Sequence, residues 1–365
     1  MSHIAIDARI INSSTGRYVE RLIHYLEKID QVNTYTILVP TKDKNFYTPS
    51  NPNFSIQTID FGNYSFAEQT SFLKYLNTLK PDLVHFCMPQ QPVLYNGKHV
   101  TTFHDLTLLN TYNSDKNWLV FHAKQIVGRF VFHRVLSTSS RVLVPTWNVK
   151  REVEAFHKGV EDKVVVTYEA ADKLQAGKVT PYESPYEKFL LYVGQQSDYK
   201  NIKRLGDAHQ KLLEKHPDLG LVLVGRINKS AQMTKDYFEK KGYKNIHFTG
   251  FVEDDQRDWL FENCAAYVFP SLMEGFGLPP LEAMQYDAPV VSSNTSCMPE
   301  VLGNAAEYFT PTDVGSMARA IDRVLTDEDL RATLIENGKI QREKYSWRKM
   351  AQETLDQYEI ALQDN

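Results

Sequence analysis

Two glutamates eight residues apart, Glu274 and Glu282, enclose a segment that could bind an anion and a sugar. The residues between them, GFGLPPL, combine two glycines with two prolines. Glycine adopts backbone angles that other residues avoid, and proline suits the start of a helix, so a flexible turn leading into a helix is predicted. A helix N-terminus presents free N–H groups and the positive end of the helix dipole, which attract phosphate or the charge of a leaving group. Glu282, in the opening turn, could accept hydrogen bonds from sugar hydroxyls.

The sequence before Glu274 indicates why this residue would face a ligand. Residues 264–269 (CAAYVF) form an apolar run that predicts a buried strand, so Glu274 follows the carboxyl end of a strand. Open α/β sheets bind ligands at that edge. Spacing alone would favour two surface charges or a capping pair. The glycines and prolines between the glutamates favour a binding loop.

Short apolar runs alternate with helical patterns along both halves of the chain, which is typical of parallel sheets with crossover helices. The expected strands span residues 3–8, 35–39, 83–86, 100–103, 141–144, 189–193, 219–224 and 265–269. A polar stretch with two prolines between Tyr168 and Tyr186 predicts a linker. The fold class is therefore α/β, with Rossmann-like domains over residues 1–170 and 186–345.

The last residues, 346–365, predict a separate helix. Ser346 is suited to be its N-cap, and apolar residues recur after it with helical spacing. The apolar positions are Trp347, Met350, Ala351, Leu355, Tyr358 and Leu362. From the pattern alone, this is an ordinary amphipathic helix that packs on a core.

The motifs of the chain resemble those of a known enzyme family. Residues 274–283 (EGFGLPPLEA) look like the E-x7-E signature of retaining GT-B glycosyltransferases of family 4 (GT4), and other motifs resemble the mannosyltransferase-like members. In family order, these are IDAR (6–9), TGRY (15–18), HDL (104–106), YVG (192–194), KN (200–201), VLVG (222–225) and FTGFV (248–252). The resemblance covers nearly the whole chain. It implies a GT-B fold, in which two Rossmann-like domains face each other across a cleft and the C-terminal helix packs on the N-terminal domain.

The resemblance implies a donor site in the C-terminal half. Glu282 would bind the ribose hydroxyls, and Glu274 would hold the transferred hexose. Lys200, on the loop after the strand that ends at Val193, would bring positive charge to the departing diphosphate, with a solvated surface lysine as the alternative. The other expected donor contacts are Gly194, Gln195, Phe251, Val252, Gly275, Phe276, Gly277 and Leu278.

One position departs from the family pattern. Many relatives carry an arginine shortly after the glycine of the YVG motif, whereas this chain has Gln195 and Gln196. An amide donates hydrogen bonds without adding positive charge. Arg204 or Arg226 could replace the missing arginine, and structural salt bridges would explain both equally well.

Three residues of the N-terminal half are further candidates. Gly16 and Arg17, in the loop after the first strand, would reach toward the donor phosphate and the acceptor. The alternative is a turn that only starts the helix up to Ile29, with Thr15 as its cap. His104 of the HDL motif is the third catalytic candidate and would contact the donor hexose. The alternative is a histidine that is hydrogen-bonded to the backbone.

The predicted function is the retaining transfer of a hexose, preferably mannose from GDP-mannose, to a glycan or lipid-linked acceptor. The resemblance implies front-face displacement, in which a phosphate oxygen of the leaving group helps accept the proton of the acceptor hydroxyl. The alternatives are a UDP-sugar-dependent transferase of glucose or N-acetylglucosamine, a sugar epimerase of the same fold, and a noncatalytic scaffold.

Several other classes of protein are excluded by motifs and charge. Neither half has the G-x-G-x-x-G fingerprint of nicotinamide dehydrogenases after its first strand. No D-x-D motif or cluster of Asp, Glu and His has metal-ligand spacing, so we predict transfer without a metal or another cofactor. The pI near 6.3 and the lack of a basic stripe exclude nucleic acid as a partner.

The composition predicts a soluble globular protein, with 42% hydrophobic and 24% charged residues among 365. Three scattered cysteines indicate neither disulfides nor zinc, and we find no secretory signal or membrane-spanning run, so we expect a cytoplasmic location. Residues 116–136 mix aromatic side chains with Lys116, Lys124, Arg129 and Arg134. Such a helix could lie on the inner face of an anionic membrane, although a core-facing helix is the favoured interpretation.

Overall fold

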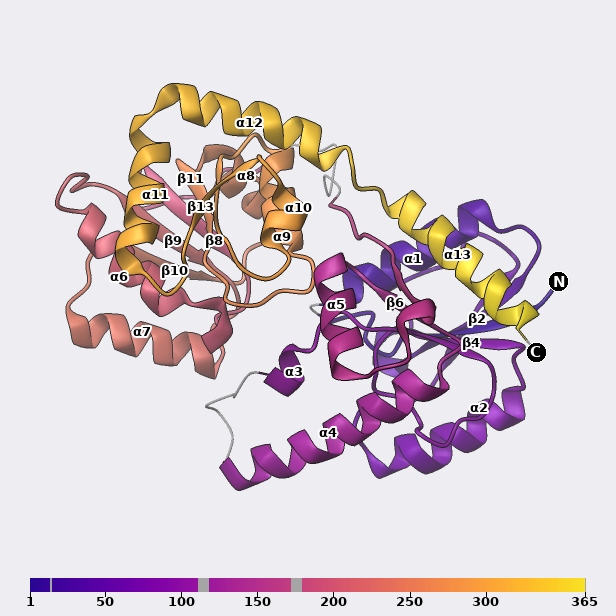
Figure 1. Cartoon of the computed structure of the whole chain (residues 1–365). Helices are drawn as coiled ribbons and strands as arrows, with labels where there is room; N and C mark the ends of the chain where they lie inside the picture. Colours follow the sequence, from indigo (N-terminus) through magenta and orange to yellow (C-terminus); the bar gives the residue numbers. More distant parts are fainter. Residues whose placement is uncertain (14, 111–117, 172–178, 365) are drawn as a thin grey trace. The chain divides into compact units, whose positions relative to one another are not determined.

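The computed structural model describes residues 1–13, 15–110, 118–171 and 179–364 (Figure 1). The chain forms two compact units. The first contains residues 1–109, 122–169 and 346–365, and the second contains residues 110–121 and 170–345. Apart from residues 110–121, the chain therefore leaves the first unit after residue 169 and returns to it at residue 346.

The first unit is built on a seven-stranded parallel sheet with the order β3-β2-β1-β4-β5-β6-β7. Its strands are β1 (His3–Asp7), β2 (Thr34–Val39), β3 (Phe54–Thr58), β4 (Leu83–Phe86), β5 (His99–Thr102), β6 (Arg141–Val144) and β7 (Val164–Val166). Successive strands are added outward from β1 to β3 on one side and from β4 to β7 on the other. The strand order therefore reverses between β1 and β4.

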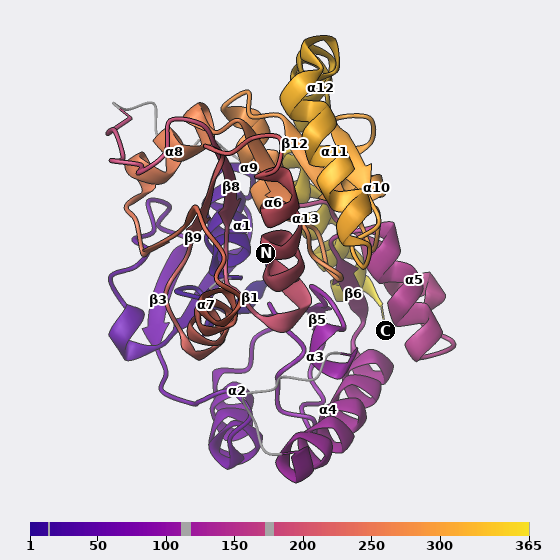
Figure 2. The ribbon, with the colours of Figure 1, turned by 90° about the vertical axis from the view of Figure 1, so that its left-hand side faces the viewer.

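Helices cover both faces of this sheet (Figures 1 and 2). The helices of this part of the chain are α1 (Gly16–Ile29), α2 (Leu73–Leu79), α3 (Thr107–Asn110), α4 (Trp118–Thr138), α5 (Trp147–Phe156) and α13 (Trp347–Gln363), with short turns at Thr41–Asp43, Glu68–Phe72 and Glu161–Lys163. Leu76 of α2 packs with Val84 and Phe86 of β4, whereas Phe132 of α4 and Val149 of α5 pack in a separate core beside β6.

The C-terminal helix α13 belongs to the first unit and lies against α1, as the resemblance implied. The Ser346 side chain caps it by accepting a hydrogen bond from Lys349 N. Every residue of the predicted apolar face is buried except Leu362, which is partly exposed. The Tyr358 hydroxyl lies 2.6 Å from His85 Nδ1 and so joins the helix to β4.

The second unit contains a six-stranded parallel sheet with the order β10-β9-β8-β11-β12-β13. Its strands are β8 (Phe189–Val193), β9 (Gly220–Val224), β10 (Ile246–Gly250), β11 (Ala266–Phe269), β12 (Val290–Ser293) and β13 (Ala306–Phe309). The strand order reverses between β8 and β11. Each unit is thus a Rossmann-like parallel sheet, as predicted.

The helices of the second unit again lie on both faces of the sheet (Figures 1 and 2). They are α6 (Ile202–Leu212), α7 (Lys229–Lys241), α8 (Asp254–Asn263), α9 (Leu278–Gln285), α10 (Met298–Leu302), α11 (Val314–Thr326) and α12 (Glu328–Arg342), with a short turn at Asp198–Lys200. α11 packs beside α6, and α12 packs beside α9. Among the helices of the described residues, none is long and apolar enough to cross a membrane.

Candidate active site

The loops that follow β8 and β11 meet where the strand order of the second sheet reverses. The loop after β8 contains Lys200, and the loop after β11 contains Glu274. Leu272 N donates a 2.8 Å hydrogen bond to Tyr199 O, which joins the two loops. Ligands of open α/β sheets bind at this kind of position. The fold therefore brings two predicted site residues from distant parts of the sequence to one place.

Lys200 and Glu274 form a largely buried ion pair. Lys200 Nζ lies 2.6 Å from Glu274 Oε1, and the two side chains are 15% and 12% exposed. The ammonium also lies 5.1 Å from the ring centre of Tyr199 and 5.6 Å from that of Phe269, so both rings attract it. Burial by itself would lower the pKa of Lys200, but the charge of Glu274 and the nearby tyrosines Tyr192 and Tyr199 raise it above its ordinary value. Lys200 is therefore positively charged at neutral pH.

Asn201 holds the Lys200 loop in place. Its backbone is left-handed, with φ of 63°, and its side chain is buried. Asn201 Nδ2 donates to Pro270 O at 3.0 Å and to Pro311 O at 2.8 Å, so it ties this loop to those after β11 and β13. Arg204 Nη1 donates to Asn201 Oδ1 at 2.9 Å. Arg204 thus supports Asn201, which is a structural use of this arginine.

Gly277 leads from the Glu274 loop into α9. It occupies the N-cap position with φ of 86°, and a Cβ atom there would lie 2.5 Å from Met298 Cε. Glycine fits both conditions and other residues do not. The helix begins at Leu278, so Glu282 lies in its second turn and not in the opening turn that we expected. Glu282 is partly buried.

Side chains from the loop after β12 hold the main chain around Glu274. Ser296 Oγ accepts a hydrogen bond from Glu274 N at 3.1 Å and donates one to Glu274 O at 2.7 Å. Cys297 Sγ donates to Glu274 O at 3.2 Å and to Phe276 O at 3.4 Å. These contacts leave the carboxylate of Glu274 available for its pair with Lys200.

The end of β12 and the same loop continue this row of hydroxyl groups. Ser293 Oγ donates to Ser271 O at 2.7 Å, and Thr295 Oγ1 lies 3.3 Å from Leu272 O. Ser296 has φ of 57°, in the left-handed region that residues with a Cβ seldom adopt. Our sequence interpretation missed these residues. The signal was the hydroxyl-rich run SSNTSC directly after an apolar pair of valines.

Glycines stand at three neighbouring strand ends of the second sheet. Gly194 and Gly225 follow β8 and β9, and Gly250 ends β10. Gly194 N donates to Val224 O at 2.9 Å, and Gly225 N donates to Gly250 O at 3.1 Å, so the glycines lie in a row. Because this edge carries no side chains at those positions, a flat group could lie against the main chain.

The residues beside the glycine row differ in exposure. Phe251 is 62% exposed, and the Arg226 guanidinium carbon lies 5.6 Å from the centre of its ring. Val252 is buried, and Gln195 is exposed. Gln196 is buried, and neither its amide nitrogen nor its amide oxygen has a hydrogen-bond partner among the described residues.

Gly16 and Arg17 start α1 in the first unit. A Cβ atom on Gly16 would lie 1.9 Å from Ile11 O, so the loop before the helix folds back tightly on this residue. Gly16 N donates to Ser13 O at 3.0 Å. Thr15 occupies the N-cap position but makes no capping hydrogen bond through its side chain. Contact of Gly16 and Arg17 with the donor stays a prediction.

His104 has protein partners at both ring nitrogens. Nε2 donates to Cys87 O at 3.0 Å, and Nδ1 lies 3.1 Å from Glu169 Oε1. The Tyr18 ring stands edge-on to the imidazole, with the ring centres 4.7 Å apart. His104 therefore has the backbone hydrogen bond that was the alternative to a sugar contact, and its contact with the hexose stays a prediction. Glu169, its carboxylate partner, was missed because it is distant in sequence.

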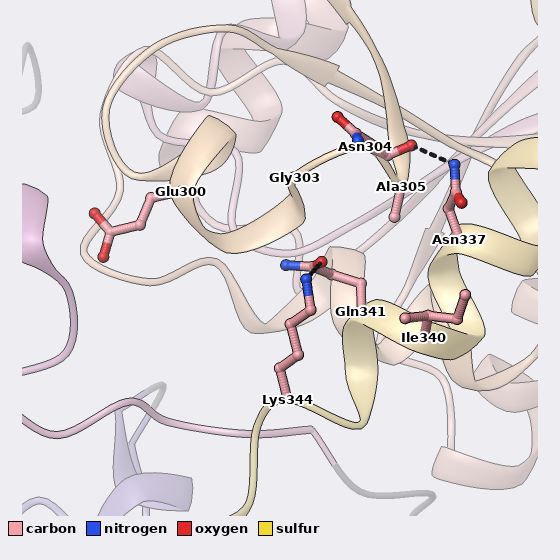
Figure 3. A pocket seen from close by; sticks show the side chains of 8 residues that line it. All are labelled: Glu300, Gly303, Asn304, Ala305, Asn337, Ile340, Gln341 and Lys344. Carbon is pink, nitrogen blue, oxygen red and sulfur yellow. Dashed lines mark hydrogen bonds between the residues drawn. The ribbon is translucent and has the colours of Figure 1, made fainter.

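A separate hollow of about 280 Å³ lies in the second unit, away from these residues (Figure 3). It is lined by Glu300, Gly303, Asn304, Ala305, Asn337, Ile340, Gln341 and Lys344. Asn337 Nδ2 donates to Asn304 O at 3.0 Å, and Lys344 Nζ donates to Gln341 Oε1 at 2.7 Å. Asn304 and Ala305 directly precede β13 and so lie at the amino edge of the sheet, opposite the edge that carries Glu274, and this hollow is therefore not part of the candidate site. Within the described ranges, no group of three or more His, Cys, Asp or Glu residues could hold a metal ion.

Comparison with protein families gives one match for each half of the chain. The family described as "Glycosyltransferase Family 4" matches residues 15–173, and the family described as "Glycosyl transferases group 1" matches residues 181–341. Together the two matches include every candidate site residue.

Relatives and solved structures agree with these matches. The chain is 27% identical to the serotype-specific mannosyltransferase WbdA of Escherichia coli over 99% of its own length and 46% of that protein's, so it spans about half of this relative. It is also 27% identical to the O-antigen chain mannosyltransferase B of Escherichia coli, over 72% of this chain and 70% of the relative. The sucrose-phosphate synthase of Thermosynechococcus elongatus is 17% identical and superposes with a TM-score of 0.78 over 99% of both chains. The predicted GT-B fold is thereby confirmed.

Proposed function

The chain belongs to the group 1 glycosyltransferases of family 4, and we propose that it moves a hexose from a nucleotide-sugar donor to a glycan or lipid-linked acceptor, with retention of the anomeric configuration. The observation that carries this proposal is the buried pair of Lys200 and Glu274, held where the second sheet reverses its strand order, next to the start of α9. A cation, a carboxylate and the positive end of a helix dipole in one place suit a sugar diphosphate.

Lys200 and α9 supply the charge that a departing diphosphate needs. An ammonium has three donors, so Lys200 can keep one hydrogen bond to Glu274 and give others to phosphate oxygens. The start of α9 adds the positive end of the helix dipole, and among its first three residues only Leu278 carries an N–H group, because the other two are Pro279 and Pro280. Glu274 then lies between the cation and the sugar, where its free oxygen can accept hydrogen bonds from hexose hydroxyls.

The nucleoside would lie along the glycine row. The open main chain at Gly194, Gly225 and Gly250 gives a base close access to backbone groups, and the exposed ring of Phe251 offers a face for stacking. Glu282 of α9 would accept hydrogen bonds from the ribose hydroxyls.

The reaction that we propose is a front-face displacement. The acceptor oxygen forms a bond to the anomeric carbon on the face from which the phosphate leaves. The bond from that carbon to the phosphate oxygen breaks, and the hydroxyl proton passes to a phosphate oxygen. Because Lys200 and the start of α9 stabilise the charge on the leaving group, the protein contributes mainly position and electrostatics.

Mannose from GDP-mannose is the donor that we propose, because the two relatives from Escherichia coli are named mannosyltransferases. Thermal denaturation with GDP, GDP-mannose, UDP, UDP-glucose and UDP-N-acetylglucosamine tests the donor. We expect GDP and GDP-mannose to raise the melting temperature and the uridine compounds to leave it unchanged. If only the uridine compounds raised the melting temperature, the donor would be a UDP-sugar and not GDP-mannose.

We also propose that α4 contacts an anionic membrane at the cytoplasmic face. Phe132 of this helix is buried, but Ile126, Val127 and Phe130 are 71%, 61% and 63% exposed, and Arg129 beside them is exposed as well. Exposed apolar residues next to a cation suit a surface of anionic lipids. Sedimentation with anionic vesicles should bring down the wild type but not an Ile126→Ser, Phe130→Ser variant. No sedimentation of the wild type would remove this part of the proposal.

A further inference from the structure

A loop in the first unit exposes two aromatic rings that the proposed donor site does not use. Residues 61–66 (FGNYSF) follow β3, and within this loop Tyr64 is 60% exposed and Phe66 is 83% exposed. Large apolar side chains held in solvent at a defined place commonly mark a binding surface. The position and the polar neighbours of these rings indicate what would bind.

The loop lies where the strand order of the first sheet reverses. β1 and β4 are neighbours at the reversal, and Arg9 and Gln90 follow their carboxyl ends. Arg9 Nη1 donates to Phe61 O at 3.1 Å, and Arg9 Nη2 donates to Gln90 O at 3.1 Å. The aromatic loop is thus attached to the edge of the sheet at which open α/β folds bind their ligands.

A buried network of ion pairs anchors the main chain of this loop. Arg9 pairs with Asp7 and with Glu68 at 2.8 Å each, and the side chains are 3%, 2% and 2% exposed. Glu68 Oε2 accepts a hydrogen bond from Tyr64 N at 3.0 Å. Because the main chain of Tyr64 is fixed by a buried carboxylate, its ring is presented in a set orientation, which lowers the entropic cost of binding.

Polar groups lie directly beside the Tyr64 ring. Gln90 is buried, and its Nε2 donates to the Tyr64 hydroxyl, which leaves the phenolic proton able to be donated to a ligand. The buried Gln90 Oε1 has no hydrogen-bond partner among the described residues, and such an acceptor is costly to leave unpaired.

We propose that Tyr64 and Phe66 form a platform for a sugar ring of the glycan acceptor, with Gln90 and the Tyr64 hydroxyl binding its hydroxyl groups. A pyranose has an apolar C–H face that packs on an aromatic ring and a rim of hydroxyls that seeks amide and carboxylate oxygens. The buried network of Asp7, Glu68 and Arg9 below the platform has one more carboxylate than cations, which disfavours an anionic lipid surface, so a neutral saccharide is the ligand that fits. This inference rests on the proposed glycosyl transfer.

The test separates saccharide binding from donor binding. Saturation-transfer NMR with a panel of α-linked mannobioses and mannotrioses, in the presence of GDP, probes the platform, and calorimetry with GDP-mannose probes the donor site. We expect saturation transfer to at least one saccharide in the wild type and about tenfold weaker binding in Phe66→Ala, as for the loss of one aromatic face. Tyr64→Phe keeps the ring but loses the hydroxyl, so it should show an intermediate loss. Phe46→Ala, which removes another exposed phenylalanine of the first unit (45% exposed), is the matched control and should bind as the wild type does.

Three outcomes would overturn the platform. The saccharides could bind Phe66→Ala as well as they bind the wild type, or the wild type could bind GDP-mannose but none of the panel. Anionic vesicles could also bind the wild type and Phe46→Ala but not Phe66→Ala, which would assign the loop to lipid. In each of these cases GDP-mannose binding would persist and the proposed donor site would stand. Failure of the wild type to bind any nucleotide sugar would instead contradict the proposed function.

Discussion

Lys200 and Glu274 are the residues on which the donor site depends. Glu274→Ala leaves the buried ammonium without its partner and the hexose without an acceptor, and Lys200→Ala removes the cation that faces the diphosphate. We expect each change to lower kcat by at least about a hundredfold, the scale of losing one group that stabilises the transition state. Steady-state rates of nucleotide release with donor and acceptor would measure it.

Lys203 provides a matched control for this prediction. It is a lysine three residues further along, 39% exposed, and paired with Asp198 at 3.6 Å. A solvent-exposed pair of this kind contributes little. Lys203→Ala should therefore turn over at the rate of the wild type. If Lys200→Ala and Lys203→Ala were equally active, the role assigned to Lys200 would be wrong.

Ser296 has a strained, left-handed backbone conformation, and its hydroxyl hydrogen-bonds to the main chain of Glu274. Ser296→Ala keeps the strain and loses the hydroxyl, whereas Ser296→Gly loses both. We expect both variants to turn over about tenfold more slowly, because Glu274 is no longer held in position. Chemical denaturation should show the glycine variant to be about 1 kcal/mol more stable than the alanine variant, since glycine adopts φ of 57° without strain.

Ser296→Thr keeps the hydroxyl and checks the positioning role. It should recover most of the turnover, although its branched side chain is strained at the same φ. The result that would count against this role is a fall in activity that follows stability alone across the three variants. The donor KM and kcat would then change with the fraction of unfolded protein and not with the presence of a hydroxyl.

At the scale of elements, the strands with continuous apolar sequences and the helix at the C-terminus were predictable, and strands with polar residues were not. β3, β7, β10, β12 and β13 are, apart from the three-residue β7, as long as several predicted strands, but the polar residues of β12 (VVSS) and β3 (FSIQT), for example, give no clear periodicity. Tertiary packing, not local propensity, makes these segments strands.

The candidate site was predictable where a loop follows a strand, and unpredictable where two loops touch. Glu274 and Lys200 each follow a recognisable strand, so their place at a sheet edge could be inferred. Their pairing depends on the strand order, which puts β8 next to β11 although more than seventy residues separate them in sequence. Ser296 depends on a third loop, and no local pattern reports that contact.

α13 should make the first unit sensitive to mild acid. His85 lies between this helix and the sheet, with Nδ1 2.6 Å from the Tyr358 hydroxyl and Nε2 2.8 Å from Thr102 Oγ1. Burial lowers its pKa to about 3, against about 6.5 in an unfolded chain. Below pH 6.5 the unfolded state binds a proton that the folded state does not, so stability is lost as the pH falls from 6.5 toward 3. The loss from this residue approaches about 1.4 kcal/mol per pH unit.

Urea unfolding at pH 7.0 and pH 5.5, followed in the wild type and in His85→Gln, would measure this effect. Glutamine can hydrogen-bond at the site but does not titrate, so the variant should lose less stability than the wild type between the two pH values. His209 of α6, whose pKa burial lowers to about 4, should contribute equally to both proteins. If the wild type and the variant lost equal stability between the two pH values, protonation of His85 would not destabilise the folded state and the prediction would be wrong.

At the scale of the whole molecule, both units place their functional residues by the same topological rule. Each parallel sheet reverses its strand order once, between β1 and β4 or between β8 and β11. The proposed acceptor platform lies at the first reversal and the proposed donor site at the second. The division of roles follows from charge, because Lys200 and the start of α9 suit a diphosphate, whereas Tyr64 and Phe66 suit a neutral saccharide.

The proposed donor site has its own positive charge, and this leads to a prediction about metals. A diphosphate leaving group carries about two negative charges, which many enzymes balance with a divalent cation. Here Lys200 pairs with Glu274 on the loop that leads into the start of α9, and the raised pKa of Lys200 keeps its charge over the whole neutral range. Turnover should therefore stay within about twofold in excess EDTA. Activity that vanishes with EDTA and returns with magnesium or manganese would mean that these groups do not balance the leaving charge.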